Sequence, residues 1–324
     1  MRYGKVSGVD NRVSRLVQGS TVLSSKEPDR SLALLDAVFQ AGCNTFDCGH
    51  IYAGGDCERV LGRWISDRQL RDKVVILDKG AHHNADRRRV TSFDIASDLH
   101  DSLARLRTDY IDLYMLHRDD QSVPVGPIVE ALNEHLASGR IRAFGGSNWT
   151  HERTAQANDY AASRGLVGFV ASSPQFSLVE QVHEPWADCV TITGQDGAPA
   201  RQWYAANSMP LFCWSSLAGG FLSGRYNRAI VESMTEEQKA KDACIICYGN
   251  QDNLKRLDRA ETLARAKGAS VPQMAIAYLM AQPLNIFALV GARTAEEFRD
   301  CAKGLEITLT AQEVAFLDLT RQEV

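Results

Sequence analysis

The feature of this sequence that most limits its possible folds is a regular alternation of short apolar strands with amphipathic helices. Eight segments are predicted to be core strands: 16–19, 45–47, 74–77, 110–116, 141–145, 167–171, 211–214 and 286–290. Helices are predicted from 28 to a stop at Gly42, at 58–65, after Thr91, and at 128–137, 152–163, 254–267, 272–281, 295–302 and 311–319. Strands joined by helical crossovers run parallel, and continuous apolar strands are covered on both faces. Eight units in 324 residues therefore favour a closed (β/α)8 TIM barrel.

The segment 2–17 alternates weakly around Gly4 and Gly8, which predicts a small β-hairpin ahead of the barrel. No internal repeat or low-complexity linker marks a domain boundary. We therefore expect residues 1–324 to form a single barrel domain with extra helices and loops in its C-terminal part. The competing open sheet that binds dinucleotides needs GxGxxG after its first strand, but the chain continues as QGSTVLSS at 18–25.

Composition excludes several classes of partner. The net charge of −4 and the pI of about 6.1 leave no overall electrostatic attraction to nucleic acid or anionic membranes, so a small-molecule ligand is expected. The apolar runs are far shorter than the roughly 20 residues of a membrane helix, and the N-terminus lacks a signal core, which predicts a cytoplasmic protein. Eight scattered cysteines indicate thiols rather than a disulfide framework. The pair Cys244 and Cys247 lacks further ligands, so no metal site is expected.

Four polar residues follow apolar strands and are candidates for catalysis. Asp47 ends NTFD, Tyr52 comes five residues later, Lys79 ends VVILDK and His117 ends DLYMLH. Taken singly, each has a structural explanation: a capping acid, a solvated lysine or a satisfied core histidine. In a parallel barrel, however, the carboxyl ends of the strands meet at one mouth, where active sites lie. The four side chains are therefore expected to come together.

At these residues the chain resembles the aldo-keto reductase family. FDCGHIYAGG at 46–55, VVILDKG at 74–80 and DLYMLHR at 112–118 match its acid–tyrosine, lysine and histidine motifs in order. GGSN at 145–148, SSPQFSL at 172–178, FCWSSLAGGFLSG at 212–224 and FALVGART at 287–294 are similar to further family motifs. The resemblance covers nearly the whole chain. It implies a reversible, NAD(P)H-dependent reduction of an aldehyde or ketone, such as a sugar or another polar carbonyl, to the alcohol.

The resemblance implies a role for each of the four residues. Tyr52 would be the general acid and base, and a tyrosine with a pKa near ~10 keeps its proton at neutral pH. Lys79 would lower the pKa of Tyr52, and Asp47 would hold the lysine ammonium in place. His117 would orient and polarise the carbonyl oxygen.

The resemblance also implies a nucleotide site. Ser147 and Asn148 would hold the carboxamide, Ser173 stands in for a common glutamine, and Trp214 would stack on the nicotinamide. The full set of predicted cofactor residues is Gly19, Ser147, Asn148, Ser173, Trp214, Ser215, Leu217, Gly219, Gly291, Arg293, Thr294 and Glu297. Arg293 at a helix start would attract a 2′-phosphate, whereas Glu297 would repel it. The family slightly favours NADP(H), and NAD(H) stays an alternative.

Substrate determinants are less well encoded. Arg118 and Trp149 are candidate pocket residues for a polar substrate. The stretch HHNADRRR at 82–89 is either a solvated basic turn or a site that attracts an anionic substrate. An irregular segment at 226–251 resembles a mobile cover. The alternative function is that of a cofactor-binding regulatory subunit with little turnover, and the oligomeric state is not predicted.

Overall fold

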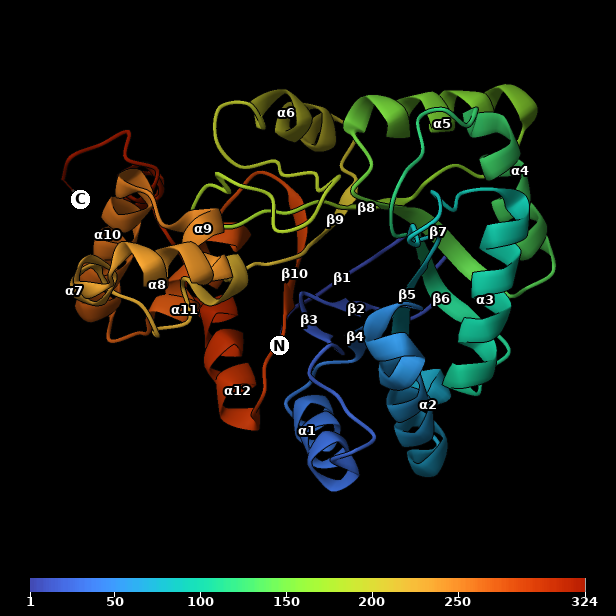
Figure 1. Ribbon diagram of the computed structural model, residues 1–324, viewed down its shortest axis with the longest axis horizontal. Coiled ribbons are helices and arrows are strands. Elements are labelled where there is room, and N and C mark those ends of the chain that lie inside the picture. The colour runs from blue at the N-terminus through green and yellow to red at the C-terminus, as the bar shows by residue number, and fades with distance from the viewer. Residues whose placement is uncertain (324) are drawn as a thin grey trace.

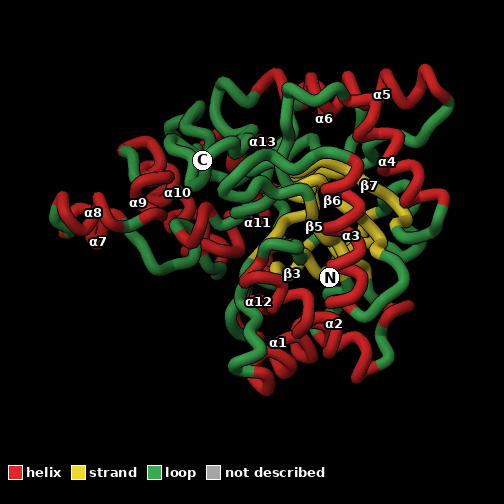
Figure 2. The backbone as a smooth tube through the Cα atoms, turned by 45° about the vertical axis from the view of Figure 1, so that its right-hand side comes forward, coloured by secondary structure: helices red, strands yellow, loops and turns green. Residues whose placement is uncertain are grey.

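The computed structural model describes residues 1–323, and its centre is a closed barrel of eight parallel strands (Figures 1 and 2). The strands are β3 (Leu16–Gly19), β4 (Thr45–Asp47), β5 (Val75–Gly80), β6 (Ile111–Leu116), β7 (Ile141–Ser147), β8 (Ala171–Ser173), β9 (Pro210–Cys213) and β10 (Asn285–Val290). The barrel closes where β10 pairs with β3, with Ala288 opposite Leu16. Ahead of it, β1 (Tyr3–Gly4) and β2 (Val13–Ser14) form an antiparallel hairpin. The predicted barrel and hairpin are both confirmed.

Helices surround the barrel, and most begin at a polar residue that caps the first turn. They are α1 (Pro28–Gln40), α2 (Asp56–Arg68), α3 (Ser92–Leu106), α4 (Val125–Ala137), α5 (His151–Arg164), α6 (Ala198–Ala206), α7 (Arg228–Ser233), α8 (Glu236–Lys241), α9 (Ala243–Tyr248), α10 (Gln251–Lys267), α11 (Val271–Met280), α12 (Ala295–Lys303) and α13 (Ala311–Leu317). The Thr91 and Thr150 side chains, for example, accept a backbone N–H at the starts of α3 and α5. Among residues 1–323, no helix has both the length and the apolarity needed to cross a membrane.

The sixth barrel strand lies later in the chain than its sequence predicts. The apolar segment at 167–171 was expected to be the strand, but β8 covers Ala171–Ser173. The backbone of Val167 is held by the Asn133 side chain, which accepts from its N–H at 3.0 Å and donates to its carbonyl at 2.9 Å. The N–H of Phe169 is likewise satisfied by the Asn158 side chain. Side-chain hydrogen bonds thus replace the strand ladder over most of this segment.

The prediction of an irregular segment at 226–251 is wrong. It forms three six-residue helices, α7, α8 and α9, which lie on one side of the molecule next to α10 and project from the barrel (Figures 1 and 2). Each begins at a cap, Asn227, Thr235 or Asp242, whose side chain accepts a backbone N–H. Helices this short carry too few turns to show apolar periodicity. The same reason accounts for α6, which the sequence did not predict.

The barrel interior is packed with side chains rather than open. Val17, Leu77 and Met115 point into a buried apolar cluster with Phe212 and Phe287, whose rings stack at 4.7 Å. Val6 and Val13 from the hairpin segment belong to the same cluster, so the hairpin covers one end of the barrel. Space for a ligand is therefore left at the other end, where the carboxyl ends of the strands lie.

A substitution at Gly62 in α2 would test how closely α2 packs against α3. Replacing Gly62 by alanine in a free helix would stabilise it by about 1 kcal/mol. Here an added Cβ would lie 2.5 Å from the carbonyl oxygen of Leu106 in α3. We therefore expect Gly62→Ala to lower the free energy of unfolding by about 1–3 kcal/mol, measured by urea denaturation. The exposed Ser66→Ala on the same helix is the control, and equal stability of both variants and wild type would refute the close packing.

Candidate active site

A cavity with a volume of about 990 Å³ lies at the carboxyl ends of the barrel strands. Seven strands contribute a residue at or just beyond their ends: Gly19, Asp47, Lys79, His117, Ser147, Trp214 and Val290. Residues far apart in the sequence therefore share one surface because parallel strands end on the same side of the barrel.

Lys79, a residue that is only 2% exposed, lies on the floor of the cavity. Its Nζ donates to the carboxylate of Asp47, to the carbonyl of Cys48 at 3.0 Å and to the hydroxyl of Tyr52 at 3.1 Å. All three contacts follow from the pairing of β4 with β5. Beyond Asp47 the chain keeps running along β5, because the N–H of Cys48 donates to Leu77 and that of His50 to Lys79. This continuation carries Tyr52 to the lysine.

Burial decides the protonation of Tyr52. Desolvation raises the pKa of Tyr52 to about 12, and this effect outweighs the opposing charge of Lys79. The net pKa shift is therefore opposite to the lowering that the sequence predicted. Burial would lower the pKa of Lys79, but its contacts with Asp47 and Tyr52 raise it above its usual value. At neutral pH the site thus holds a protonated tyrosine beside a charged lysine.

His117 forms the wall beside Tyr52, with ring centroids 5.6 Å apart in an edge-on arrangement. Burial, followed by the positive charge of Lys79, holds the pKa of His117 well below its usual value, so the imidazole is neutral. Its Nδ1 atom is buried and has no hydrogen-bond partner among residues 1–323. A neutral imidazole carries one N–H and can donate it to a ligand oxygen without adding a charge.

The backbone near the cavity adopts left-handed conformations at residues other than glycine. Asn148 has φ 56° and Ser215 has φ 52°, and Ala218 at φ 53° follows in the same loop as Ser215. Such conformations cost free energy and cluster at ligand sites. The Asn148 amide compensates by donating to the carbonyl of His117 at 3.3 Å and accepting from Val190 at 3.1 Å.

The far end of the cavity is formed by the start of α12. Thr294 caps this helix by accepting the N–H of Glu297, and the Glu297 carboxylate accepts the N–H of Arg293 at 2.7 Å. A carboxylate therefore occupies part of the helix N-terminus, where anions bind favourably. Glu297 and Arg293 both line the cavity.

The residues present fit an extended dinucleotide. Trp214 gives an aromatic wall just beyond the end of β9, and its Nε1 is buried without a partner among residues 1–323. Gly219 and Gly291 expose backbone on the cavity lining, and Arg293 supplies a cation just before α12. A nicotinamide ring would require the aromatic wall, a pyrophosphate the exposed backbone, and an adenosine phosphate the cation.

The structure brings most of the predicted site residues to this cavity. Those that line it are Asp47, Tyr52, Lys79, His117, Arg118, Gly19, Ser147, Asn148, Trp214, Ser215, Leu217, Gly219, Gly291, Arg293 and Glu297. Three do not. Ser173 donates its hydroxyl to the carbonyl of Phe212, and Thr294 is used as the helix cap. Trp149 is fully buried and packs on Phe169 with ring centroids 4.8 Å apart.

The basic stretch at 82–89 divides into two parts. His82 and His83 line the cavity, but the arginines pair with acids: Arg87 with Asp94, Arg88 with Asp188 and Arg89 with Asp98. These arginines therefore do not provide a site for an anionic substrate.

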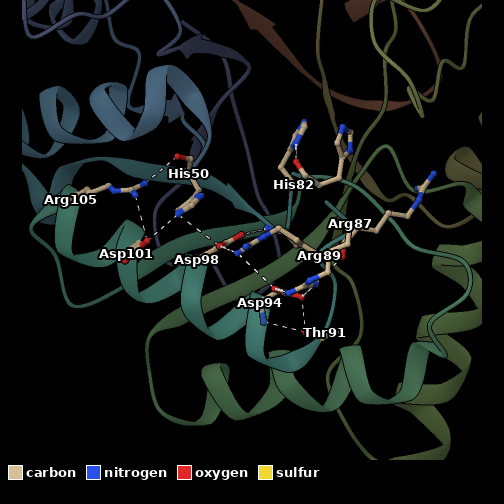
Figure 3. Close-up of polar contacts among 12 residues, drawn as sticks. His50, His82, Arg87, Arg89, Thr91, Asp94, Asp98, Asp101 and Arg105 are labelled. Carbon is tan, nitrogen blue, oxygen red and sulfur yellow. Dashed lines mark hydrogen bonds and ion pairs between the residues drawn. The ribbon is translucent and has the colours of Figure 1, made fainter. Parts of the chain in front are cut away.

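Helix α3 also holds the loop that precedes Tyr52. Asp98 lies 3.8 Å and Asp101 3.2 Å from the His50 imidazole (Figure 3). Asp98 also accepts the N–H of Ala81. Acids on one face of α3 thus anchor both the segment after β4 and the segment after β5, while Arg105 reaches back to the carbonyl of His50.

Sequence reasoning missed the loop between β8 and α6. Trp186 and Cys189 of this loop line the cavity, and the Trp186 ring lies 6.2 Å from that of Trp214. The expected cover at 226–251 contributes no residue to the lining. The loop has no periodic pattern, and an exposed tryptophan in HEPWADC at 183–189 was the only signal for it.

Comparison with known proteins adds a family assignment to this geometry. The model of the Aldo/keto reductase family matches residues 15–321. An uncharacterized oxidoreductase of Bacillus subtilis (strain 168) is 28% identical over 98% of this chain and 95% of its own. A "probable voltage-gated potassium channel subunit beta" of Oryza sativa subsp. japonica is 26% identical over 95% of this chain and 92% of its own. The solved glycerol dehydrogenase of Gluconobacter oxydans shares the fold, with a TM-score of 0.79 and 21% identity over 97% of this chain and 93% of that chain.

The buried ion pair between Asp47 and Lys79 is expected to contribute to the stability of the fold. Asp47→Asn leaves the Lys79 ammonium buried without its carboxylate, so we expect the free energy of unfolding to fall by about 3–5 kcal/mol. The double variant Asp47→Asn with Lys79→Met removes both charges and should recover most of this loss. The exposed pair Arg63–Asp67 provides the control, since Asp67→Asn should cost less than about 1 kcal/mol. Urea denaturation that finds the single variant as stable as the double one would contradict the pairing.

Proposed function

The chain belongs to the aldo/keto reductase family of NAD(P)H-dependent oxidoreductases, and we propose that it reduces a polar aldehyde or ketone with Tyr52 as the general acid. The observation that carries this proposal is the contact of the Tyr52 hydroxyl with the buried Lys79 ammonium at 3.1 Å, beside neutral His117. A cofactor-binding regulatory subunit is not favoured, because both the family and its oxidoreductase relatives support carbonyl reduction.

The chemistry requires a proton donor and stabilisation of the charge that develops on oxygen. Bound NAD(P)H supplies the hydride. Tyr52, with a pKa raised to about 12 by burial, still carries its proton at neutral pH and gives it to the carbonyl oxygen. The charge left on Tyr52 is stabilised by Lys79, whose position is held by Asp47.

His117 completes this arrangement. Its neutral imidazole can donate an N–H to the same carbonyl oxygen and orient it toward Tyr52. In the oxidative direction the same tyrosine, once deprotonated, accepts the proton of the alcohol. The charged pair Lys79–Asp47 does not need to change its protonation in either direction.

We also propose that the cavity accepts NAD(H) as well as NADP(H). Arg293 would attract a 2′-phosphate, but the Glu297 carboxylate is fixed at the start of α12 by the N–H of Arg293. A phosphate placed there meets a fixed negative charge, which weakens its binding. The family preference for NADP(H) is therefore reduced in this chain.

The role of Tyr52 is tested by Tyr52→Phe. We expect the rate of aldehyde-dependent NAD(P)H oxidation, followed by absorbance, to fall by about 10²–10⁴-fold, because the proton donor at the reacting oxygen is lost. Cofactor affinity, measured by fluorescence titration, should stay within about threefold of wild type. Tyr110→Phe removes a hydroxyl just before β6, at the opposite end of that strand from His117, and should leave the rate unchanged. A Tyr52→Phe enzyme as fast as wild type would sink the proposal.

The cofactor proposal is tested by Glu297→Gln. We expect this variant to raise the affinity for NADPH relative to NADH by about tenfold, since one repulsive charge near the 2′-phosphate is removed. Titration of both reduced cofactors measures the ratio. Glu296→Gln changes the same charge in the first turn of α12 at a residue that does not line the cavity, and its ratio should stay closer to wild type. An unchanged ratio for Glu297→Gln would show that the carboxylate does not reach the phosphate.

A further inference from the structure

Arg118, directly after His117, is a buried cation without a carboxylate partner. The residue is 5% exposed, and its side chain forms no ion pair with any acid among residues 1–323. The guanidinium donates through Nη1 to the carbonyl of His117 at 3.0 Å, and Nη2 lies 3.9 Å from the sulfur of Cys189, which is a weak acceptor. The Nε atom has no partner among the described residues. Most of the hydrogen-bonding capacity of this cation is therefore unused.

The other buried arginines show how unusual this is. Arg153 is 8% exposed and pairs with Asp119 at 3.1 Å, and Arg256 is 9% exposed and pairs with Glu180 at 2.5 Å. Asp119 is the next residue after Arg118, yet its carboxylate is used by Arg153. A buried charge without a counter-ion costs free energy, so it is retained where a ligand supplies the missing partner.

The position of Arg118 in the cavity indicates what kind of ligand could supply this partner. It lines the active-site cavity together with His117, His82 and Cys189. The Lys79 ammonium is paired with the Asp47 carboxylate, and burial lowers the pKa values of His117 and His82. Arg118 therefore brings to this end of the cavity a positive charge that no acid of the described chain pairs with.

Arg118 is also held in position. The indole N–H of Trp149 donates to the carbonyl of Arg118 at 3.2 Å, and Trp149 is fully buried against Phe169. A rigid backbone lowers the entropy lost when the guanidinium binds a ligand. Trp149, which does not reach the cavity, thus supports the residue that does.

We propose that Arg118 binds a carboxylate of the substrate, so that the natural substrate is an aldehyde or ketone that carries a carboxylate group. This inference rests on the proposed reductase function and names the substrate class of the same site. A planar guanidinium matches the two oxygens of a carboxylate and forms strong charge-assisted hydrogen bonds with it. A phosphate dianion would require more than one cation, whereas Arg118 is a single guanidinium beside Cys189 and the uncharged His117.

The experiment compares acids with their uncharged esters. Glyoxylate, succinic semialdehyde and para-carboxybenzaldehyde are each assayed against the corresponding methyl ester, and kcat/KM is measured with purified protein and NAD(P)H. We expect the best acid to exceed its ester by at least about tenfold, because only the acid supplies a counter-ion for Arg118. For Arg118→Gln the acid-to-ester ratio should fall by about 10-fold to 100-fold, chiefly through KM. Arg164→Gln, an exposed arginine on α5, should keep the wild-type ratio.

A binding measurement gives a readout that does not depend on turnover. Succinate should raise the thermal unfolding temperature of wild type and of Arg164→Gln, whereas succinamide at the same concentration should not. Arg118→Gln should lose the succinate effect. If that variant does not fold, Arg118→Lys keeps the charge but loses the planar fork, and it should show an intermediate acid-to-ester ratio.

The outcomes separate the two proposals. If wild type reduces esters and acids equally well and Arg118→Gln leaves the ratio unchanged, the carboxylate inference is overturned while the reductase function stands. If wild type reduces no carbonyl compound at all, the proposed function fails, and the succinate shift then decides by itself whether Arg118 forms an anion site. A succinate shift that survives in Arg118→Gln overturns the inference in either case.

Discussion

The burial of one ammonium group is the constraint on which the candidate active site depends. Lys79 lies at the end of β5 inside a packed barrel, and a charge in this environment is stable only beside an opposite charge and hydrogen-bond acceptors. Asp47 supplies that charge because β4 is the neighbour of β5 in the barrel. The segment after Asp47 then follows β5 and supplies the carbonyl of Cys48 and the hydroxyl of Tyr52. The position of Tyr52 is thus a consequence of satisfying the lysine.

Other parts of the structure keep this arrangement in place. The hairpin covers the end of the barrel away from the cavity, where Val6 and Val13 pack on the apolar interior. On the outer side, acids of α3 bind the segments that follow β4 and β5, through His50 and Arg89 among others (Figure 3). Arg87 and Arg89 therefore pair with acids of α3, and Arg88 pairs with Asp188. Arg118 differs from them because nothing in the described chain neutralises it.

Much of the fold was predictable because its signals are local. Apolar strands alternate with helices over nearly the whole length, and that periodicity required only neighbouring residues to recognise. The strand at 167–171 was misplaced because Asn133 and Asn158, distant in sequence, bind its backbone. The helices α6 to α9 were missed because six to nine residues carry little periodicity. The role of the loop with Trp186 was not predicted, because an irregular segment has no periodic pattern. The contact of Trp186 with Trp214 is formed only in the folded chain.

The sequence by itself determined the barrel and the residue types at its strand ends, since periodicity and strand-terminal position are properties of the chain. It therefore identified Asp47, Tyr52, Lys79 and His117 as a group that would share one cavity. Only the tertiary structure decided the electrostatics of that cavity. Whether the pKa of Tyr52 rises or falls depends on how much burial opposes the charge of Lys79, and here burial prevails. Which of the buried arginines lacks a counter-ion depends on contacts between distant segments, because desolvation and charge pairing are set by the surroundings of a residue in space.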